Sequence, residues 1–381
     1  MTWQYRPQID TSMRCSQTNG NGYLVMSEGK KFERHADRVG GYESSAPSCL
    51  MVTGGAGFIG TNFVRYVLAR HPDTHIVVYD LLTYAAKMDN LHGLIPDRID
   101  MVHADICDAE SVDRAIRRFR VDAIVNFAAE SHNDNSIQDP APFIRTNLYG
   151  TYVLLEAARR HDLRFHQVST DEVFGDLDFD DPDRFTETSP YRPSSPYSAT
   201  KAGADHLARA WCRTYGTRVT ISNCSNNYGP YQHIEKFIPR QITNILSGIR
   251  PRIYGHGRAI RDWIHVEDDC RAIWSILVHG APGSTYLIGA DGELSNMEVL
   301  RMILRLMGRR PDEFDLVADR PGGDRRYAID AGKIRRELDW QPLHRDFEQG
   351  LAETIDWYRR HRRWWADDKQ AVEARYREQG H

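Results

Sequence analysis

The sequence has no excess of charge of either sign, since 49 lysines and arginines nearly balance 53 aspartates and glutamates, giving a net charge of −4. Nucleic-acid-binding proteins normally carry a basic excess, so we expect no nucleic-acid partner. Long apolar runs are also missing. None approaches the roughly 20 residues of a membrane-spanning helix, so we expect no membrane insertion. Acidic ligands must then be bound by local positive groups.

Cysteine is scarce and scattered. The six cysteines contain no C-x-x-C pair and no spacing typical of metal ligands. Such thiols indicate a reducing cytoplasm, where we expect the protein to be located. A second candidate ligand group, His265 with Glu267, Asp268 and Asp269, matches no metal-ligand pattern, and we interpret it as an acidic surface turn. We therefore expect no metal.

Three segments differ in composition. Residues 1–48 are polar, rich in Gly, Ser and Asn, and lack the apolar core of a signal peptide, so they are predicted to be a poorly ordered extension. The sequence does not distinguish an extension that has a function from one that results only from the choice of translation start. Residues 49–225 alternate strand and helix patterns. Residues 226–381 alternate less clearly and predict a smaller α/β substrate-binding domain, with some segments returning to the first domain.

The first domain is predicted to be a doubly wound parallel sheet, an α/β fold. Four short apolar runs predict buried strands at 49–53, 75–79, 121–127 and 164–169. Two helical stripes are predicted between them, one of Ile59, Phe63 and Val67 and another of Ile144, Leu148, Thr151, Leu155 and Ala158. Because the strands are almost wholly apolar, helices should cover both faces of the sheet.

A glycine motif, Thr53-Gly54-Gly-Ala-Gly57-Phe-Ile-Gly60, follows the first strand and opens the first helix. Gly54 permits the tight turn, Gly57 lets the backbone approach a pyrophosphate, and Gly60 allows close packing of helix and strand. The helix start adds a positive end for the phosphates. The motif predicts that residues 49–225 are a Rossmann-type, dinucleotide-binding domain.

An acidic residue selects the dinucleotide. Asp80 ends the second strand, 20 residues after Gly60, where a carboxylate accepts hydrogen bonds from ribose hydroxyls. No Arg or Lys stands at 81–84 to hold a 2′-phosphate, which favours NAD over NADP. Asp105 and Ile106, after the third strand, are predicted to border the adenine.

Two further motifs carry chemistry. Tyr197-Ser-Ala-Thr-Lys201 follows Pro196 at a helix start, so the phenol and the ammonium lie one turn apart on one face. We expect the ammonium to lower the pKa of the phenol and make Tyr197 a base. The neighbouring carboxyl groups of Asp171 and Glu172 follow a predicted strand, where they can divide acid and base duties.

Six motifs together show a resemblance: Gly54-Gly-Ala-Gly-Phe-Ile-Gly60, Asn126-Phe-Ala-Ala-Glu-Ser-His132, Ser169-Thr-Asp-Glu172, Tyr197-Ser-Ala-Thr-Lys201, Asn226-Asn-Tyr-Gly-Pro230 and Arg261-Asp-Trp-Ile-His-Val266. From about Leu50 to the C-terminus the chain resembles the dTDP-glucose 4,6-dehydratases of the extended short-chain dehydrogenase/reductase family, in their actinobacterial rhamnose-pathway branch. The Thr-Asp-Glu triplet is the narrowest of these signals, because related epimerases and decarboxylases usually lack an acid where Asp171 stands.

The resemblance implies sets of site residues. The catalytic set is Thr170, Asp171, Glu172, Tyr197 and Lys201. The NAD-binding set is Gly54, Gly57, Phe58, Ile59, Gly60, Asp80, Leu81, Thr83, Asp105, Ile106, Ala128, Ala129, Thr146, Tyr197, Lys201 and Asn227. The set for the dTDP-hexose is Ser131, Thr170, Asn226, Lys236, Phe237, Arg252, Tyr254, Arg261, Asn296 and Arg320.

The implied reaction is a dehydration without net oxidation. Tyr197 takes the proton of the sugar C4 hydroxyl while hydride passes from C4 to NAD, and Thr170 polarises the C4 oxygen. Glu172 removes the C5 hydrogen, and protonated Asp171 donates to the departing C6 hydroxyl. The hydride then returns to C6, and C5 is reprotonated. The product is dTDP-4-keto-6-deoxy-glucose, and the cofactor should stay bound through turnover.

The sequence departs from the family pattern at two positions. Gly323 stands where the family usually has His, and Asn135 stands where many members have Arg. The resemblance therefore predicts the reaction type more firmly than the nucleotide base of the substrate. By family analogy, we expect the helices at 140–160 and 196–216 to pack against a second subunit and form the four-helix interface of a homodimer. The rival interpretations are an NAD-dependent nucleotide-sugar 4-epimerase or decarboxylase and, more distantly, a non-catalytic NAD-binding sensor.

Overall fold

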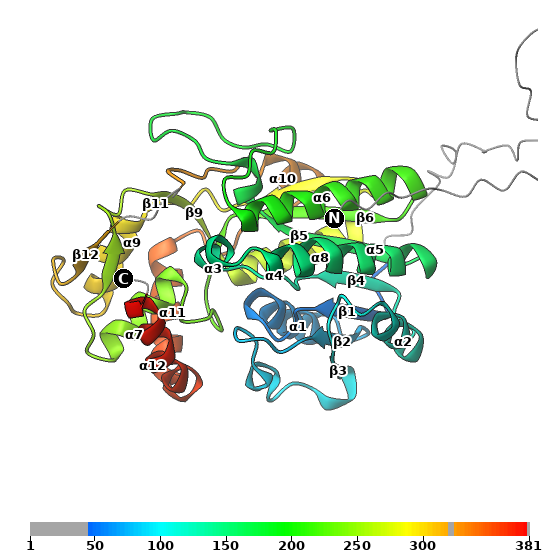
Figure 1. Ribbon diagram of the computed structural model, residues 1–381, viewed down its shortest axis with the longest axis horizontal. Coiled ribbons are helices and arrows are strands. Elements are labelled where there is room, and N and C mark those ends of the chain that lie inside the picture. Colours follow the sequence, from blue (N-terminus) through cyan, green and yellow to red (C-terminus); the bar gives the residue numbers. More distant parts are fainter. Residues whose placement is uncertain (1–44, 319–323, 379–381) are drawn as a thin grey trace, which may run out of the picture. The chain divides into compact units, whose positions relative to one another are not determined.

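The computed structural model of the chain describes residues 45–318 and 324–378 (Figure 1). Seven parallel strands form the main sheet, in the order β10-β6-β5-β4-β1-β2-β3: β1 (Cys49–Thr53), β2 (His75–Asp80), β3 (Ile99–His103), β4 (Ala123–Asn126), β5 (Arg164–Thr170), β6 (Val219–Cys224) and β10 (Thr285–Ile288). Two small sheets contain the other strands: β7 (Asn226–Tyr228), β9 (Ile260–His265) and β11 (Glu293–Ser295) in one, β8 (Arg252–Tyr254) and β12 (Asp315–Val317) in the other.

Helices fill the connections. The α-helices are α1 (Phe58–Arg70), α2 (Ala109–Phe119), α3 (Asn133–Gln138), α4 (Ala141–Phe143), α5 (Thr151–Arg160), α6 (Pro196–Tyr215), α7 (Phe237–Leu246), α8 (Val266–His279), α9 (Asn296–Leu306), α10 (Gly332–Leu338), α11 (Phe347–Arg360) and α12 (Arg362–Glu378). The 3-10 turns are η2 (Met88–Leu91), η3 (Pro96–Arg98) and η5 (Asp171–Phe174), and η4 (Ile144–Gly150) is a π-helix.

Helices cover both faces of the main sheet, as the apolar strands predicted. Side chains alternate along β1, so Val52 packs in a core with α1 and α8, and Met51 packs in a second core with α2, α5 and α6. The four predicted strands correspond to β1, β2, β4 and β5. The doubly wound α/β fold is confirmed.

One predicted helical stripe is partly wrong. Thr151, Leu155 and Ala158 are buried, but Ile144 is 54% exposed. The reason is that η4 is a π-helix, whose wider turn rotates its residues relative to the face that α5 buries.

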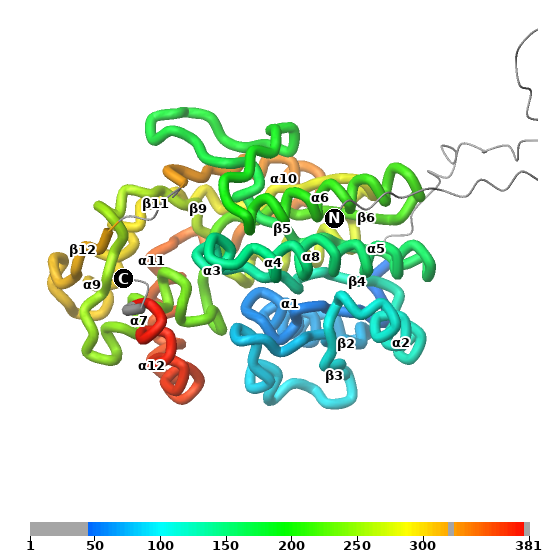
Figure 2. The backbone as a smooth tube through the Cα atoms, in the orientation of Figure 1, coloured from blue at the N-terminus to red at the C-terminus, as the bar shows by residue number. Residues whose placement is uncertain are grey.

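Segments from beyond residue 225 also join the first sheet. β10 pairs with β6, and α8 and α10 pack against the same core as α1. A further core lies among α7, α9, α11 and α12, and Figure 2 shows α12 in red beside α7. The division into two domains and the boundary at 225 stay predictions.

The start of the described chain is tied to the sheet. The Ser48 amide donates to the Asp122 carboxylate at 2.8 Å, and the Ser48 carbonyl accepts from the His75 amide at 2.9 Å. The predicted extension at 1–48 otherwise falls on residues 1–44, which lie outside the described residues. Among the residues that the structure describes, no helix is long and apolar enough to cross a membrane.

The parallel register brings the motif residues to one edge of the sheet. Thr53 at the end of β1 is level with Asn126 of β4, and Thr170 at the end of β5 is level with Cys224 of β6. The carboxyl ends of parallel strands in such folds face the ligand crevice. The glycine motif and the paired carboxyl groups, which follow β1 and β5, therefore open into a common space.

Candidate active site

The glycine loop between β1 and α1 is as tight as its sequence predicted. Gly54 has φ +66°, and a Cβ there would lie 2.7 Å from the Ala128 amide nitrogen. A Cβ on Gly60 would lie 2.2 Å from the Gly54 carbonyl oxygen. Gly57 caps α1 without a side-chain hydrogen bond. The loop thus combines close backbone packing with a helix start, a combination suited to an anionic phosphate.

Asp80 is fixed beside this loop. Its carboxylate accepts hydrogen bonds from the Ala56 amide at 2.9 Å and from the Leu82 amide at 2.8 Å. Burial raises the pKa of Asp80, and the two amide donors act in the opposite direction. Each carboxylate oxygen keeps a second lone pair that can accept a hydroxyl proton, as ribose recognition requires.

The loop forms one wall of a cavity that we name the glycine pocket. All sixteen residues predicted to bind NAD line it: Gly54, Gly57, Phe58, Ile59, Gly60, Asp80, Leu81, Thr83, Asp105, Ile106, Ala128, Ala129, Thr146, Tyr197, Lys201 and Asn227. Thr170, Asp171 and Glu172 line the same cavity. The structure therefore gathers the predicted cofactor residues and the predicted catalytic residues around a single space.

Tyr197 and Lys201 lie in the first turns of α6. Ser195 caps the helix in a reciprocal box with Ser198, and Pro196 occupies the first helical position. Both motif side chains are buried, and the Lys201 ammonium donates to the Val168 carbonyl at 2.6 Å. The predicted placement on one helix face toward the pocket is confirmed.

The predicted effect of Lys201 on the phenol is wrong in this structure. Burial raises the pKa of Tyr197 well above its usual value, and the nearby charges of Glu172 and Asp171 raise it further. The contact with the Thr170 hydroxyl acts in the opposite direction, and the Lys201 ammonium is directed to the Val168 carbonyl. The net shift of the phenol pKa is thus opposite to the predicted one.

The neighbouring carboxyl groups differ in their surroundings. Asp171, the first residue of η5, is 1% exposed, and its Oδ1 accepts from the Thr170 hydroxyl at 3.1 Å. Glu172 is only partly buried, and its Oε2 accepts from the Asn133 amide at 2.8 Å. One carboxyl group therefore sits in a dry environment and the other in a polar one.

These surroundings separate the protonation of the two groups. Burial raises the pKa of Asp171 well above its usual value, and repulsion from Glu172 adds to the effect. Burial also raises the pKa of Glu172, and the hydrogen bond from Asn133 and the charge of Arg261 offset only part of this increase. Asp171 is thus the natural proton donor of the pair and Glu172 the natural acceptor.

A second cavity, which we name the arginine pocket, adjoins the first. Eight of the residues predicted to bind substrate line it: Ser131, Asn226, Lys236, Phe237, Arg252, Tyr254, Arg261 and Asn296. Thr170 lines the glycine pocket instead, and Arg320 and Gly323 lie outside the described residues. Glu172 lines both cavities and Asp171 lines the glycine pocket alone, so the two cavities adjoin each other at Glu172.

Four basic side chains line the arginine pocket, and one of them, Arg240, is paired with the Glu373 carboxylate. The Arg261 guanidinium lies 4.5 Å from the centre of the Tyr327 ring and donates to the Asp324 carbonyl at 3.1 Å. The Lys236 ammonium donates to the Ser131 carbonyl at 2.8 Å. Since these contacts use neutral carbonyl groups, the positive charges stay available to a diphosphate.

Several lining residues had no signal in the sequence. Asn133, which holds Glu172, directly follows the motif that ends at His132 and could have been found by extending it. Tyr327 and Tyr376 line the arginine pocket from distant segments, where nothing in the local sequence marks them. Asn135, the departure from the family pattern, accepts from the Arg375 guanidinium on α12 at 2.6 Å.

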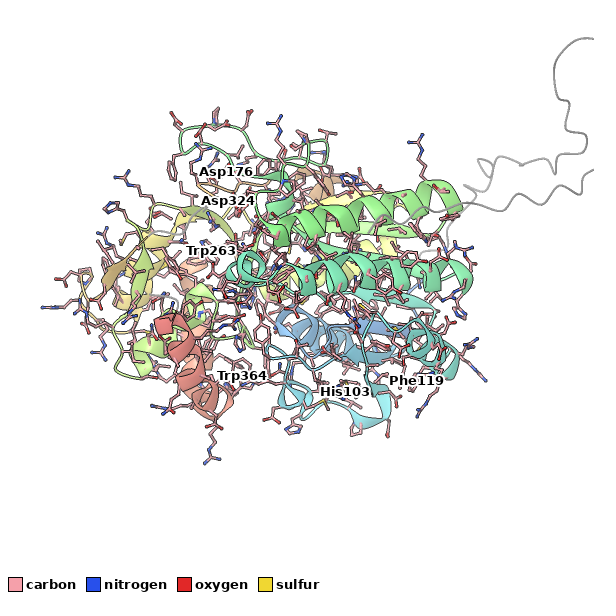
Figure 3. All side chains as sticks on the ribbon, in the orientation of Figure 1. His103, Phe119, Asp176, Trp263, Asp324 and Trp364 are labelled. Carbon is pink, nitrogen blue, oxygen red and sulfur yellow. The ribbon has the colours of Figure 1, made fainter. Side chains whose placement is uncertain are left out.

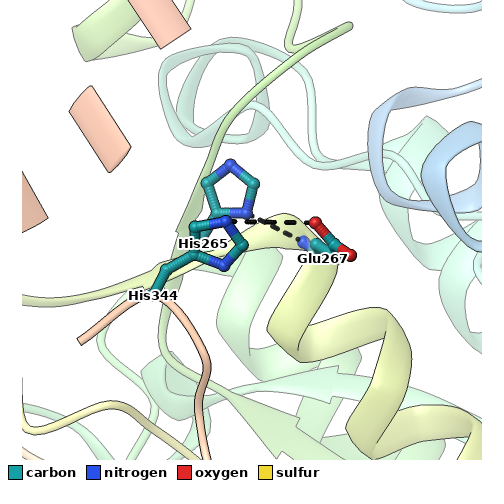
Figure 4. Close-up of side chains that lie close together, drawn as sticks. All are labelled: His265, Glu267 and His344. Atoms are coloured by element: carbon teal, nitrogen blue, oxygen red, sulfur yellow. Dashed lines mark hydrogen bonds and ion pairs between the residues drawn. The ribbon is translucent and has the colours of Figure 1, made fainter. Parts of the chain in front are cut away.

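The histidine–acid group considered for a metal is not a surface turn, so that prediction is wrong. Asp268 and Asp269 are fully buried, and Asp268 accepts from the amides of Leu343 and His344. His265, Glu267 and His344 do come together (Figure 4). The two imidazole rings are stacked, however, with centroids 3.8 Å apart, so their in-plane lone pairs do not converge on one ion.

This cluster predicts a pH-dependent stability. The hydrogen bond to Asp268 raises the pKa of His344 above 6.5, and the charges of Asp268, Glu267 and Glu353 reinforce the shift, while His265 stays neutral because burial lowers its pKa to about 4. A raised histidine pKa gives stability that is full below 6.5 and is lost as pH rises through the folded value. The melting temperature of His344→Gln should therefore fall below that of the unaltered chain at about pH 6, and the difference should narrow toward about pH 9.

A matched control is His92→Gln, since the His92 side chain is 79% exposed. Its melting temperature should follow the unaltered chain at each pH. A His344→Gln difference that widens with rising pH would contradict the assignment of a protonated His344.

Comparisons with known proteins agree with this geometry. Residues 51–354 match the family model described as GDP-mannose 4,6 dehydratase. The dTDP-glucose 4,6-dehydratase of Mycobacterium tuberculosis (strain H37Rv) is 59% identical over 331 residues, which cover 87% of this chain and 99% of the relative. The similarity thus spans most of the chain.

Two solved structures, one of a dehydratase and one of an epimerase, have a fold similar to that of this chain. DesIV, the dTDP-glucose 4,6-dehydratase of Streptomyces venezuelae solved with NAD bound, is 48% identical with a TM-score of 0.80, over 83% of this chain and 98% of DesIV. The UDP-glucose 4-epimerase of Thermus thermophilus is 28% identical with a TM-score of 0.75, over 82% of this chain and 99% of that one. The chain therefore belongs to the dTDP-glucose 4,6-dehydratases of the extended short-chain dehydrogenase/reductase family.

Proposed function

We propose that the protein is an NAD-dependent hydro-lyase that converts dTDP-glucose to dTDP-4-keto-6-deoxy-glucose. The observation that carries the proposal is the Asp171–Glu172 pair, since both residues line the glycine pocket and Glu172 also lines the arginine pocket. A dehydratase needs one acid to expel water and one base to remove a hydrogen, and this pair supplies both. An epimerase has no step that requires them.

The glycine pocket fits NAD. Its glycine loop leaves no room for a Cβ on Gly54 or Gly60, its helix start faces the cavity, and Asp80 stands beside it. NAD, when bound, accepts a hydride from the sugar and later returns it. Phe58, Ile59 and Ala128 provide apolar wall, and we assign Lys201 to the nicotinamide ribose.

Tyr197 is the base for the C4 hydroxyl in this proposal. Its phenol is buried in the glycine pocket near the paired carboxyl groups. Removal of this proton, together with loss of the C4 hydrogen as hydride, leaves a C4 ketone, whose oxygen we assign to the Thr170 hydroxyl. NAD held by the residues of the glycine pocket would place positive charge beside the phenol and so oppose the raised pKa of Tyr197.

The carboxyl pair completes the elimination. The C4 ketone acidifies the C5 hydrogen, which ionised Glu172 removes as a proton. Protonated Asp171 gives its proton to the C6 hydroxyl, the C6–O bond breaks, and water leaves. The surroundings of the two groups support this division, because Asp171 is the drier and more strongly protonated one.

The arginine pocket is assigned to the dTDP part of the substrate. Arg252, Arg261 and Lys236 supply charge for the diphosphate, and Phe237, Tyr254, Ser131, Asn226 and Asn296 line the remaining wall. The guanidinium of Arg261 suits a bidentate phosphate contact.

We also propose a homodimer. Ile144, Tyr149, Tyr152 and Tyr215 are all more than a third exposed, and they lie on the η4–α5 and α6 helices that the family analogy selected. A contiguous exposed apolar surface of this kind is typical of a protein interface. A cytoplasmic location stays a prediction.

The direct test is incubation with dTDP-glucose. We expect a product with the alkaline absorbance of a 4-keto-6-deoxy sugar and no net change in the cofactor. A 4-epimer or a decarboxylated sugar without that absorbance would favour the rival enzymes, and NAD binding without turnover would favour a sensor.

A further inference from the structure

We propose that Lys87, Asn90, Trp364 and Asp368 form a clasp that retains the cofactor, by fastening the segment after β2 to α12 across the mouth of the glycine pocket. The inference rests on the proposed function, since it takes the glycine pocket as the NAD site. None of the four residues lines that pocket, so their role is to hold the cavity closed and not to contact the cofactor.

The segment at 81–91 forms part of the pocket wall. Leu81, Thr83, Ala85 and Ala86 line the cavity. The next residues tie the segment to the glycine loop, because the Lys87 amide donates to the Ala56 carbonyl at 3.2 Å and the Asn90 side chain donates to the same carbonyl at 2.8 Å. A displacement of this segment would therefore open the cavity beside the glycine loop.

The outer side of the segment is fastened to α12. The Lys87 ammonium lies 4.7 Å from the centre of the Trp364 ring, donates to the Trp364 carbonyl at 2.6 Å and pairs with Asp368. The Trp364 indole donates to the Asn90 side chain at 2.6 Å. Figure 3 labels Trp364 where α12 meets this part of the chain. The segment and the helix are thus joined by more than one kind of contact.

α12 is anchored firmly on the other side of the active site. The Arg240 guanidinium of α7 makes two contacts of 3.2 Å with the Glu373 carboxylate. Trp365 is 1% exposed and donates to the Tyr358 carbonyl at 2.9 Å, and the Tyr376 hydroxyl donates to the Glu235 carbonyl at 2.9 Å. Since α12 is fixed to the core of the arginine pocket, the clasp joins the two pockets across their shared opening.

A second link crosses the same opening. The Tyr84 hydroxyl, from the segment after β2, donates to the Glu235 carboxylate at 3.3 Å, and Glu235 lines both pockets. The backbone carbonyl of Glu235 also accepts the hydrogen bond from the Tyr376 hydroxyl of α12. We expect a bound dinucleotide to leave only when these contacts separate. Retention of the cofactor is useful in a reaction that regenerates the same form of the cofactor in every turnover.

The test measures the exchange of bound NAD for labelled NAD in the full chain, followed by rapid filtration. In Lys87→Met and Asp368→Asn, exchange should be at least about tenfold faster, since loss of a charge-assisted hydrogen bond typically changes an equilibrium by that much. The matched control is Lys333→Met. Lys333 makes the same pair of contacts, lying 4.4 Å from the Tyr286 ring centre and donating to the Thr285 carbonyl at 2.8 Å, but these contacts join α10 to β10 and not the segment after β2 to α12.

The exchange rates distinguish the clasp from a general loss of stability and from failure of the proposed function. Faster exchange in both clasp variants, with the control at the original rate, supports the clasp. Unchanged exchange in Asp368→Asn and in Lys87→Met overturns it while leaving NAD binding and the proposed function intact. Equal acceleration in Lys333→Met would show a loss of general stability and also overturn the clasp. A chain that binds no NAD at all would overturn the proposed function itself.

Discussion

Asp171→Asn is expected to lower the rate of product formation by about 10² to 10⁴-fold, the usual value of a positioned proton donor. The amide keeps the size of the carboxyl group and can still accept from the Thr170 hydroxyl, but it cannot give a proton to the departing C6 hydroxyl. The earlier removal of the C5 hydrogen does not need Asp171. In deuterated water, this variant should therefore still exchange the C5 hydrogen of dTDP-glucose while it releases little water-eliminated product.

A matched control for this experiment is Asp268→Asn. Asp268 is also a fully buried carboxyl group, but it accepts from the Leu343 and His344 amides and lines neither pocket. Its replacement should reduce the melting temperature more than the turnover. If Asp171→Asn turned over substrate as fast as this control, Asp171 would not be the acid.

Glu172→Gln is expected to cause a loss of similar size, again about 10² to 10⁴-fold, but at the preceding step. The amide can still bond to Asn133, so the loop should keep its position, yet it cannot accept the C5 proton. The exchange of the C5 hydrogen with deuterated water should disappear together with product formation. The two variants are thus distinguished by this exchange, which persists in one and is lost in the other.

NAD content provides the check on folding for both variants. Neither substitution changes the glycine loop or Asp80, so the bound cofactor should stay at the level of the unaltered chain. Persistent C5 exchange in Glu172→Gln would mean that another group removes the hydrogen, and the assignment of the base would be wrong.

The sequence predicted the parts of the site that local constraints determine. The Gly54 turn, Asp80 at the end of β2, the Tyr197–Lys201 spacing on α6 and the carboxyl groups after β5 all depend on a few neighbouring residues and a strand–helix pattern. Because parallel strands place such segments at one edge, their meeting in a single pocket followed from the fold class.

The remainder depends on tertiary contacts that no local pattern encodes. The phenol pKa is the clearest case, since a Tyr-x-x-x-Lys spacing says nothing of the Val168 carbonyl that takes the ammonium. The burial of Asp268 reflects the approach of residues 343–344 from far along the chain. The clasp likewise joins Lys87, near the start of the described chain, to Asp368, near its end, through a helix whose polar pattern gives no sign of a partner.

In the proposed reaction, a hydride leaves C4 of the sugar, water is then eliminated, and the same hydride returns to C6 of the same molecule. The most direct measurement uses dTDP-glucose labelled with deuterium at C4 and locates the label in the product by NMR. We predict deuterium at C6 of the 4-keto-6-deoxy sugar, with C5 carrying a hydrogen from solvent. Deuterium still at C4 of an epimer, or lost to the solvent, would contradict it.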